Sequence, residues 1–166
     1  MRAIEAAISA PDVAGILVSG AEGVGKSRSA REALSAAESQ GWDIRWTAGA
    51  SSARAIPLGA FTAWAPSDVT DTVSLLRGVI DALTASNANV VVGVDDVHLL
   101  DELSTFVVHQ IVTRGAAKVV LTVRDGEPVP LRYRRFGRAA GSIASISSDC
   151  RLIRAVNRRR RASGSI

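Results

Sequence analysis

The chain has 166 residues, of which 47% are apolar and only one, Cys150, is a cysteine. This length suits a single domain, the apolar share is too high for a disordered chain, and one cysteine excludes an internal disulfide or a multi-cysteine metal site. The net charge of +4 is unevenly distributed, because ten basic and fifteen acidic residues precede Leu131, whereas ten arginines and one acid follow from there.

The charge asymmetry divides the chain into an acidic body, residues 1–130, and a basic tail, residues 131–166. A tail of this kind is typical of proteins that bind nucleic acid or another anionic surface. Residues 1–12 lack the long apolar core of a signal peptide and predict a short amphipathic helix. No apolar run approaches the roughly 20 residues of a membrane span, so we expect a cytoplasmic protein without membrane contact.

Beyond this helix, strands and helices are expected to alternate. Four short segments, apolar throughout or alternating, predict strands: residues 13–19, 42–49, 89–96 and 118–125. Alanine-rich composition or apolar residues at helical spacing predict three helices between them: residues 26–39, 69–83 and 103–111. Residues 52–68 contain two prolines and a glycine and predict a loop.

Alternating strands and helices predict an α/β fold, a three-layer parallel sheet with helices on both faces. Right-handed crossovers place the carboxyl ends of all strands at one edge of such a sheet, where ligands bind. The most polar segments between the predicted elements, Gly20–Ser27, Asp95–Asp96 and Arg124–Asp125, all fall at this edge. The sequence therefore predicts one site built from three segments.

The segment GAEGVGKS, residues 20–27, fits the phosphate-loop pattern G-x-x-x-x-G-K-[ST]. Its glycines let successive backbone N–H groups point at phosphate oxygens. Lys26 is predicted to contact the β- and γ-phosphates, and the Ser27 hydroxyl to bind Mg²⁺. The ligands implied are ATP or ADP with Mg²⁺. The predicted nucleotide-binding residues are Gly20, Ala21, Glu22, Gly23, Val24, Gly25, Lys26, Ser27 and Arg28.

Three further side chains complete the predicted site. Asp95, at the end of a buried strand, is predicted to hold Mg²⁺, and Asp96 to orient or deprotonate the attacking water. A helix N-cap is the simpler interpretation of such an aspartate, but the phosphate loop earlier in the chain favours the metal role. Arg124, also at a strand end, is predicted to stabilise the γ-phosphate, with a merely solvated arginine as the alternative.

These motifs resemble the ATPase module of large LuxR-type transcriptional regulators, which are signal-transducing ATPases with numerous domains (STAND) related to AAA+ and NB-ARC ATPases. The likeness covers residues 15–130 and rests above all on GAEGVGKSRSAREAL, VVVGVDDVHLLD and VVLTVRDGEPVP. It implies a Walker A motif at Gly20–Ser27, a Walker B motif at Asp95 and Asp96, and a sensor arginine at Arg124.

The resemblance ends at Pro130, where the family continues with a fifth strand, in the sheet order 5-1-4-3-2, and a helical lid. Residues 131–166 show no strand or helix period and are rich in Arg, Ser, Ala and Gly, as G/C-rich DNA yields in a shifted reading frame. We therefore expect a truncated module with four strands, the fifth strand lost, residues 13–19 left as an exposed edge, and a poorly ordered tail.

The function expected from the resemblance is that of the ATP-binding module of a LuxR-type regulator, with very slow or absent hydrolysis. DNA would then be contacted only through domains absent from this chain, and the oligomeric state stays open. One alternative is a small P-loop metabolite kinase, for which the loop 48–66 offers Arg54 but no acid. The other is a non-specific nucleic-acid binder that uses the arginines of the tail.

Overall fold

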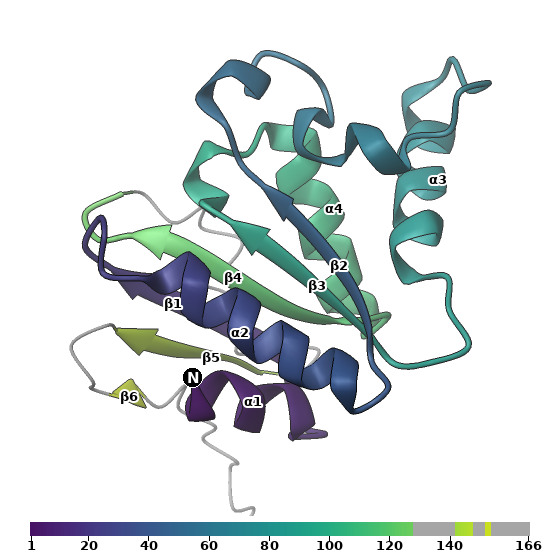
Figure 1. Cartoon of the computed structure of the whole chain (residues 1–166). Helices are drawn as coiled ribbons and strands as arrows, with labels where there is room; N and C mark the ends of the chain where they lie inside the picture. Colours follow the sequence, from purple (N-terminus) through teal and green to yellow (C-terminus); the bar gives the residue numbers. More distant parts are fainter. Residues whose placement is uncertain (128–141, 148–151, 154–166) are drawn as a thin grey trace, which may run out of the picture.

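A computed structural model describes residues 1–127, 142–147 and 152–153 of the chain (Figure 1). The strands are β1 (Val13–Gly20), β2 (Asp43–Ala48), β3 (Val90–Asp95), β4 (Lys118–Arg124), β5 (Ser142–Ser147) and β6 (Leu152–Ile153). The α-helices are α1 (Arg2–Ser9), α2 (Lys26–Ser39), α3 (Thr72–Thr84) and α4 (Glu102–Arg114). Short 3₁₀ helices are η1 (Ser51–Ala53), η2 (Gly59–Trp64) and η3 (Val97–Leu99).

The described strands form one sheet in the order β2-β3-β4-β1-β5-β6. Strands β1 to β5 pair in parallel, and β6 runs antiparallel to β5. The four strands predicted from apolar runs are confirmed, each to within one residue at either end. Helix α3 begins at Thr72 rather than residue 69, because the Asp71 carboxylate accepts a hydrogen bond from Ser74 N and caps the helix there.

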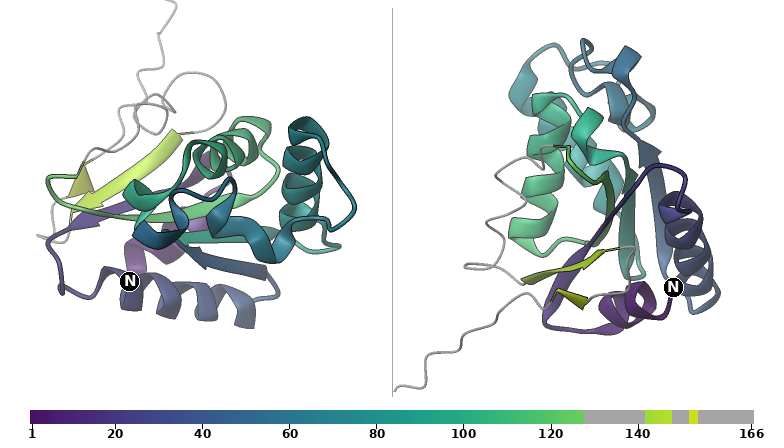
Figure 2. Two further views of the ribbon diagram at one scale, coloured as in Figure 1. Left: turned by 90° about the horizontal axis from the view of Figure 1, so that it is seen from above. Right: turned by 90° about the vertical axis from the view of Figure 1, so that its left-hand side faces the viewer.

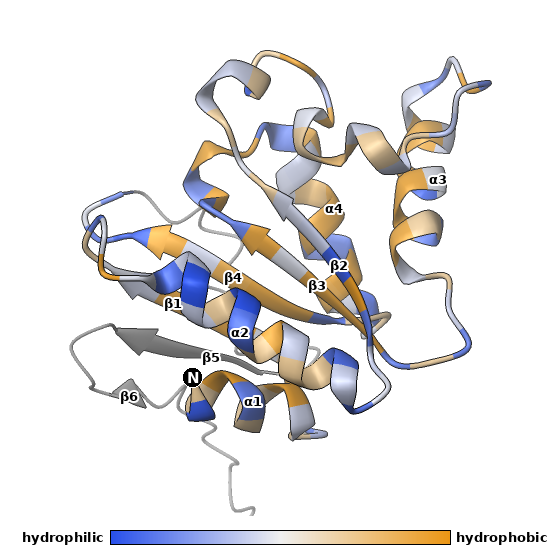
Figure 3. Ribbon diagram, viewed as in Figure 1, coloured by the Kyte–Doolittle hydropathy of each residue, from blue (hydrophilic) through white to orange (hydrophobic). Residues whose placement is uncertain are grey.

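The sheet lies between two helical layers, as predicted (Figure 2, right). Helices α1 and α2 pack on one face over Ile16, Val91 and Val120, while α3 and α4 cover the other face. Figure 3 shows apolar residues concentrated in β3 and β4, with polar residues along α2. Because both faces of the central strands are covered, their sequences are apolar runs rather than alternating patterns.

The prediction that residues 52–68 are only a loop is wrong. The segment contains part of η1 and all of η2, and it contributes Leu58 (1% exposed) and Phe61 (0%) to the core against α3 and α4. The breaks at Pro57, Gly59 and Pro66 exclude a long α-helix, but they allow 3₁₀ turns, which need only three residues each. The segment therefore packs over the carboxyl ends of the strands instead of extending into solvent.

The prediction that the fifth strand is lost is also wrong. Residues 142–147 form β5, which pairs in parallel with β1 from Val13↔Ser142 to Ser19↔Ser147. Strand β1 therefore lies between β4 and β5, not at an exposed edge, and the order 5-1-4-3-2 is retained. Pairing uses backbone N–H and C=O groups, so a segment without apolar periodicity can complete the sheet.

The rest of the basic tail lies outside the described residues, and its origin in a shifted reading frame stays a prediction. Within the described part of the chain, no helix combines the length and apolar character needed to cross a bilayer.

Candidate nucleotide-binding site

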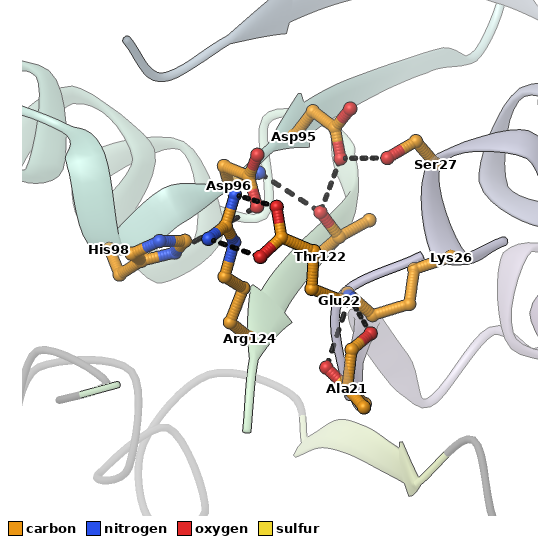
Figure 4. A network of polar contacts seen from close by, with 10 residues as sticks. Ala21, Glu22, Lys26, Ser27, Asp95, Asp96, His98, Thr122 and Arg124 are labelled. Carbon is orange, nitrogen blue, oxygen red and sulfur yellow. Dashed lines mark hydrogen bonds and ion pairs between the residues drawn. The ribbon is translucent and has the colours of Figure 1, made fainter. Parts of the chain in front are cut away.

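The carboxyl edge of the sheet brings the three predicted segments together, as Figure 4 shows. The phosphate loop, residues 20–27, leaves β1 and enters α2, while Asp95 ends β3 and Arg124 ends β4. Strand β4 lies between β1 and β3, so side chains from all three strands reach a common centre. The parallel topology alone explains why residues so distant in sequence meet here.

The phosphate loop has the backbone that its glycines predict. Gly23 and Gly25 have φ angles of 77° and 87°, a left-handed region in which side chains with a Cβ are strained. Residues 21–25 are exposed, whereas Lys26, the first residue of α2, is 9% exposed. The free N–H groups of this helix terminus therefore lie beside an accessible loop, the arrangement that binds phosphate.

The Lys26 side chain turns back into the loop that precedes it. Its Nζ donates to the carbonyl oxygens of Gly20 (3.0 Å) and Ala21 (2.8 Å). The ammonium group is thereby held at the centre of the loop, with a third N–H available in its donor set. A phosphate placed on the loop would meet this positive charge directly.

Ser27 and Asp95 form the predicted metal pair. Ser27 Oγ donates to Asp95 Oδ1 at 2.8 Å, so a hydroxyl and a carboxylate oxygen lie side by side. Asp95 is buried, with 8% of its surface exposed, so the packing around it restricts the position of its carboxylate. Oxygen donors of this kind suit Mg²⁺, which needs only one or two protein oxygens because water and phosphate complete its octahedron. The residues present therefore fit the ion.

Thr122 supports this pair from the neighbouring strand, a role that the sequence analysis missed. Its hydroxyl donates to Asp95 Oδ1 and accepts from the backbone N–H of Asp96 (2.9 Å), and its side chain is fully buried. One hydroxyl thus fixes both aspartates of β3's end. The available signal was that Thr122 is the single polar residue inside the apolar run of residues 119–123.

Asp96 follows β3 in a left-handed conformation, with φ 49° and ψ 54°. Gly49 permits this turn, since a Cβ at Gly49 would lie 2.5 Å from the Asp96 carbonyl oxygen. The Asp96 carboxylate is 30% exposed and lies 3.9 Å from Nδ1 of His98, which is buried beside it. Such a strained backbone at the end of a strand is common in active sites.

Arg124 is held across the loop by Glu22. Its two terminal nitrogens lie 3.0 and 2.9 Å from the two Glu22 carboxylate oxygens, a bidentate ion pair between β4 and the phosphate loop. The sequence analysis placed both residues in the site but did not pair them. Arg28, the last predicted residue, instead pairs with Glu32 along the exposed side of α2.

The comparisons with known proteins found similarity in structure but not in sequence. The sequence matches no protein-family model, and no curated protein matches it either. Its structure is similar to that of AMPPCP-bound DnaA from Aquifex aeolicus, with a TM-score of 0.54 and 16% identity over 87% of this chain and 44% of that chain. A second similar structure is the RuvB Holliday junction branch migration motor of Thermotoga maritima, with a TM-score of 0.46 and 16% identity over 87% and 43%.

The chain spans less than half the length of either protein, and at this identity the likeness to DnaA concerns the fold. Sheet order, covering helices and the loop between β1 and α2 together define the class: the described residues have the three-layer fold of the P-loop NTPases, as predicted.

Proposed function

We propose that this chain is an ATP-binding module that binds Mg-ATP and Mg-ADP through residues 20–28. The observation that carries the proposal is the convergence of Lys26, Ser27 and Asp95 at the carboxyl edge of the sheet. A glycine turn before a helix needs neither a central ammonium group nor a hydroxyl–carboxylate pair. The AMPPCP-bound state of DnaA, a protein of similar fold, supports a nucleotide as the ligand.

Each residue has a defined task in this proposal. Backbone N–H groups of the loop and of the first turn of α2 would bind phosphate oxygens, and Lys26 would exchange its carbonyl partners for the β- and γ-phosphates. Ser27 and Asp95 would hold Mg²⁺, which neutralises phosphate charge. Asp96 would orient the attacking water, while Thr122 keeps its backbone in place.

The biological role that we propose is that of a regulatory switch of the STAND class, as in LuxR-type transcriptional regulators. This finer assignment is supported by the sequence resemblance over residues 15–130. ATP binding would shift the equilibrium between two conformations because ATP contacts one of them better. DNA contact would belong to other domains of such a regulator.

The first test measures nucleotide affinity and its dependence on Mg²⁺ by calorimetry. The whole chain should bind ATP more tightly with Mg²⁺ than with EDTA, because Ser27 and Asp95 supply ligands to the ion. Ser27→Ala should reduce this Mg²⁺ enhancement at least about tenfold, as loss of metal-site partners does. Ser29→Ala, two residues along the same helix, is the control. A folded protein that binds no nucleotide would refute the proposal.

We also predict that hydrolysis is slow, with turnover below about 0.1 s⁻¹. An arginine contact at the γ-phosphate accelerates phosphoryl transfer by about 10³–10⁵, but Glu22 pairs with the guanidinium of Arg124 and competes with the γ-phosphate for it, which weakens this contact. Phosphate release should be followed over hours, and Asp96→Asn should abolish whatever rate is found. Faster turnover that disappears in Asp96→Asn would show that the site is already complete for catalysis.

A further inference from the structure

The ion pair between Arg124 and Glu22 links two residues 102 positions apart in the sequence, at the mouth of the phosphate loop (Figure 4). Arg124 is the side chain assigned to the γ-phosphate in the proposed function, and Glu22 occupies both of its terminal nitrogens. A carboxylate and a phosphate present similar pairs of oxygens to a guanidinium fork, so they are alternative partners for the same donors.

The pair is not needed to hold the loop against β4. The backbone N–H of Asp125 donates to the Gly20 carbonyl at 3.0 Å, and Lys26 binds the Gly20 and Ala21 carbonyls. These contacts connect the start of the loop to the end of β4 and to α2 without the Glu22 side chain. The carboxylate therefore contributes something other than loop attachment.

The pair is also placed where it can exchange. The side chains of Arg124 and Glu22 are 39% and 73% exposed, so water screens their attraction and solvates Glu22 when it leaves. A terminal phosphate carries more negative charge than a carboxylate and binds the fork with the same geometry. ADP ends at the β-phosphate and does not supply this third phosphate to Arg124.

We propose that Glu22 competes with the γ-phosphate for Arg124 and thereby sets how strongly the chain prefers ATP over ADP. The inference rests on the proposed function, because it assigns a specificity-determining role within the same site. The binding of ATP requires free energy to break the Arg124–Glu22 pair, whereas the binding of ADP leaves the pair intact. The wild-type preference for ATP is therefore smaller than that of a chain in which Arg124 is free.

The test compares the affinities for Mg-ADP and for a Mg-bound non-hydrolysable ATP analogue in Glu22→Gln. The variant should raise the ratio of ATP-analogue to ADP affinity about two- to fivefold, the range that an exposed ion pair can contribute. Glu32→Gln is the matched control, because it removes the same charge from the exposed Arg28–Glu32 pair on α2. Its ratio should equal that of the wild type.

The double variant Glu22→Gln/Arg124→Ala separates competition for Arg124 from simple repulsion between Glu22 and phosphate. With Arg124 removed, Glu22→Gln should no longer change the ratio, as a double-mutant cycle requires of coupled residues. The same increase with and without Arg124, or an equal change for both nucleotides in Glu22→Gln, would overturn the inference while leaving nucleotide binding intact. A wild type that binds neither nucleotide would overturn the proposed function and this inference with it.

Discussion

Lys26→Ala is expected to weaken the binding of both Mg-ATP and Mg-ADP at least tenfold. The side chain is the positive charge at the centre of the phosphate loop, held there by the Gly20 and Ala21 carbonyls. Hydrogen bonds to charged groups contribute about 1.5–3 kcal/mol, and about 1.4 kcal/mol corresponds to a tenfold change in affinity. Both nucleotides should be affected because both carry the β-phosphate.

The fold should survive this substitution. The Gly20 carbonyl also accepts a hydrogen bond from Asp125 N, and Ala21 is exposed, so water can replace the ammonium group there. The control is Lys118→Ala, the only other lysine of the chain, which binds the Ala10 and Val13 carbonyls at the opposite edge of the sheet. Calorimetry should find its nucleotide affinity unchanged. An equal loss of nucleotide affinity in both variants would mean that a general loss of protein stability, not the missing phosphate contact, weakens binding.

The parts of the site that the sequence predicts are those that leave a local signal. Glycine spacing with Lys26 and Ser27 identifies the phosphate loop, because the backbone curvature and the charge are needed within eight residues. Asp95 is identified by its place at the end of a buried strand. Both signals depend only on neighbours along the chain. The parallel topology then places the residues that carry them at one edge of the sheet.

The parts that the sequence does not predict depend on contacts between distant segments. Thr122 reaches Asp95 only because β3 and β4 are neighbours, and Arg124 reaches Glu22 only because β4 lies beside β1. Strand β5 is defined by its pairing with β1, and the sequence of residues 142–147 has no apolar run that would predict it. The 3₁₀ turns that place Phe61 in the core likewise have no strong local pattern.

Asp101 is the clearest example of such a contact. Its carboxylate caps α4 by accepting from Leu103 N and Ser104 N, both at 3.0 Å. It also accepts from the backbone N–H groups of Leu58 (3.1 Å) and Gly59 (3.2 Å), which begin η2. One side chain therefore joins the start of α4 to the segment that covers the carboxyl edge of β2 and β3.

Asp101→Ala should accordingly lower the free energy of unfolding by roughly 2–3 kcal/mol, because it removes the cap of α4 and the hydrogen-bond partner of the Leu58 amide. The Gly59 amide keeps its second acceptor, the Ile56 carbonyl (2.9 Å). The measurement is urea unfolding at neutral pH. Asp71→Ala is the matched control, since Asp71 caps α3 from an exposed position and accepts from Ser74 N within its own helix turn. The free energy of unfolding should fall clearly less in Asp71→Ala than in Asp101→Ala. Equal losses would mean that Asp101 acts only as a cap.

The effect of Asp101→Ala should also depend on pH. Burial raises the pKa of the Asp101 carboxyl, but hydrogen bonds from Ser104, Leu58 and Leu103 together outweigh burial, so its pKa lies below the ordinary value. A carboxyl with a lowered pKa in the folded state stabilises the protein above its unfolded pKa, near 3.9, and loses this contribution as the pH falls through the folded value. The difference in unfolding free energy between wild type and variant should therefore be constant from neutral pH to about pH 5 and shrink below about pH 4. A difference that stays constant at acid pH would show that the ionised carboxylate is not what connects α4 to η2.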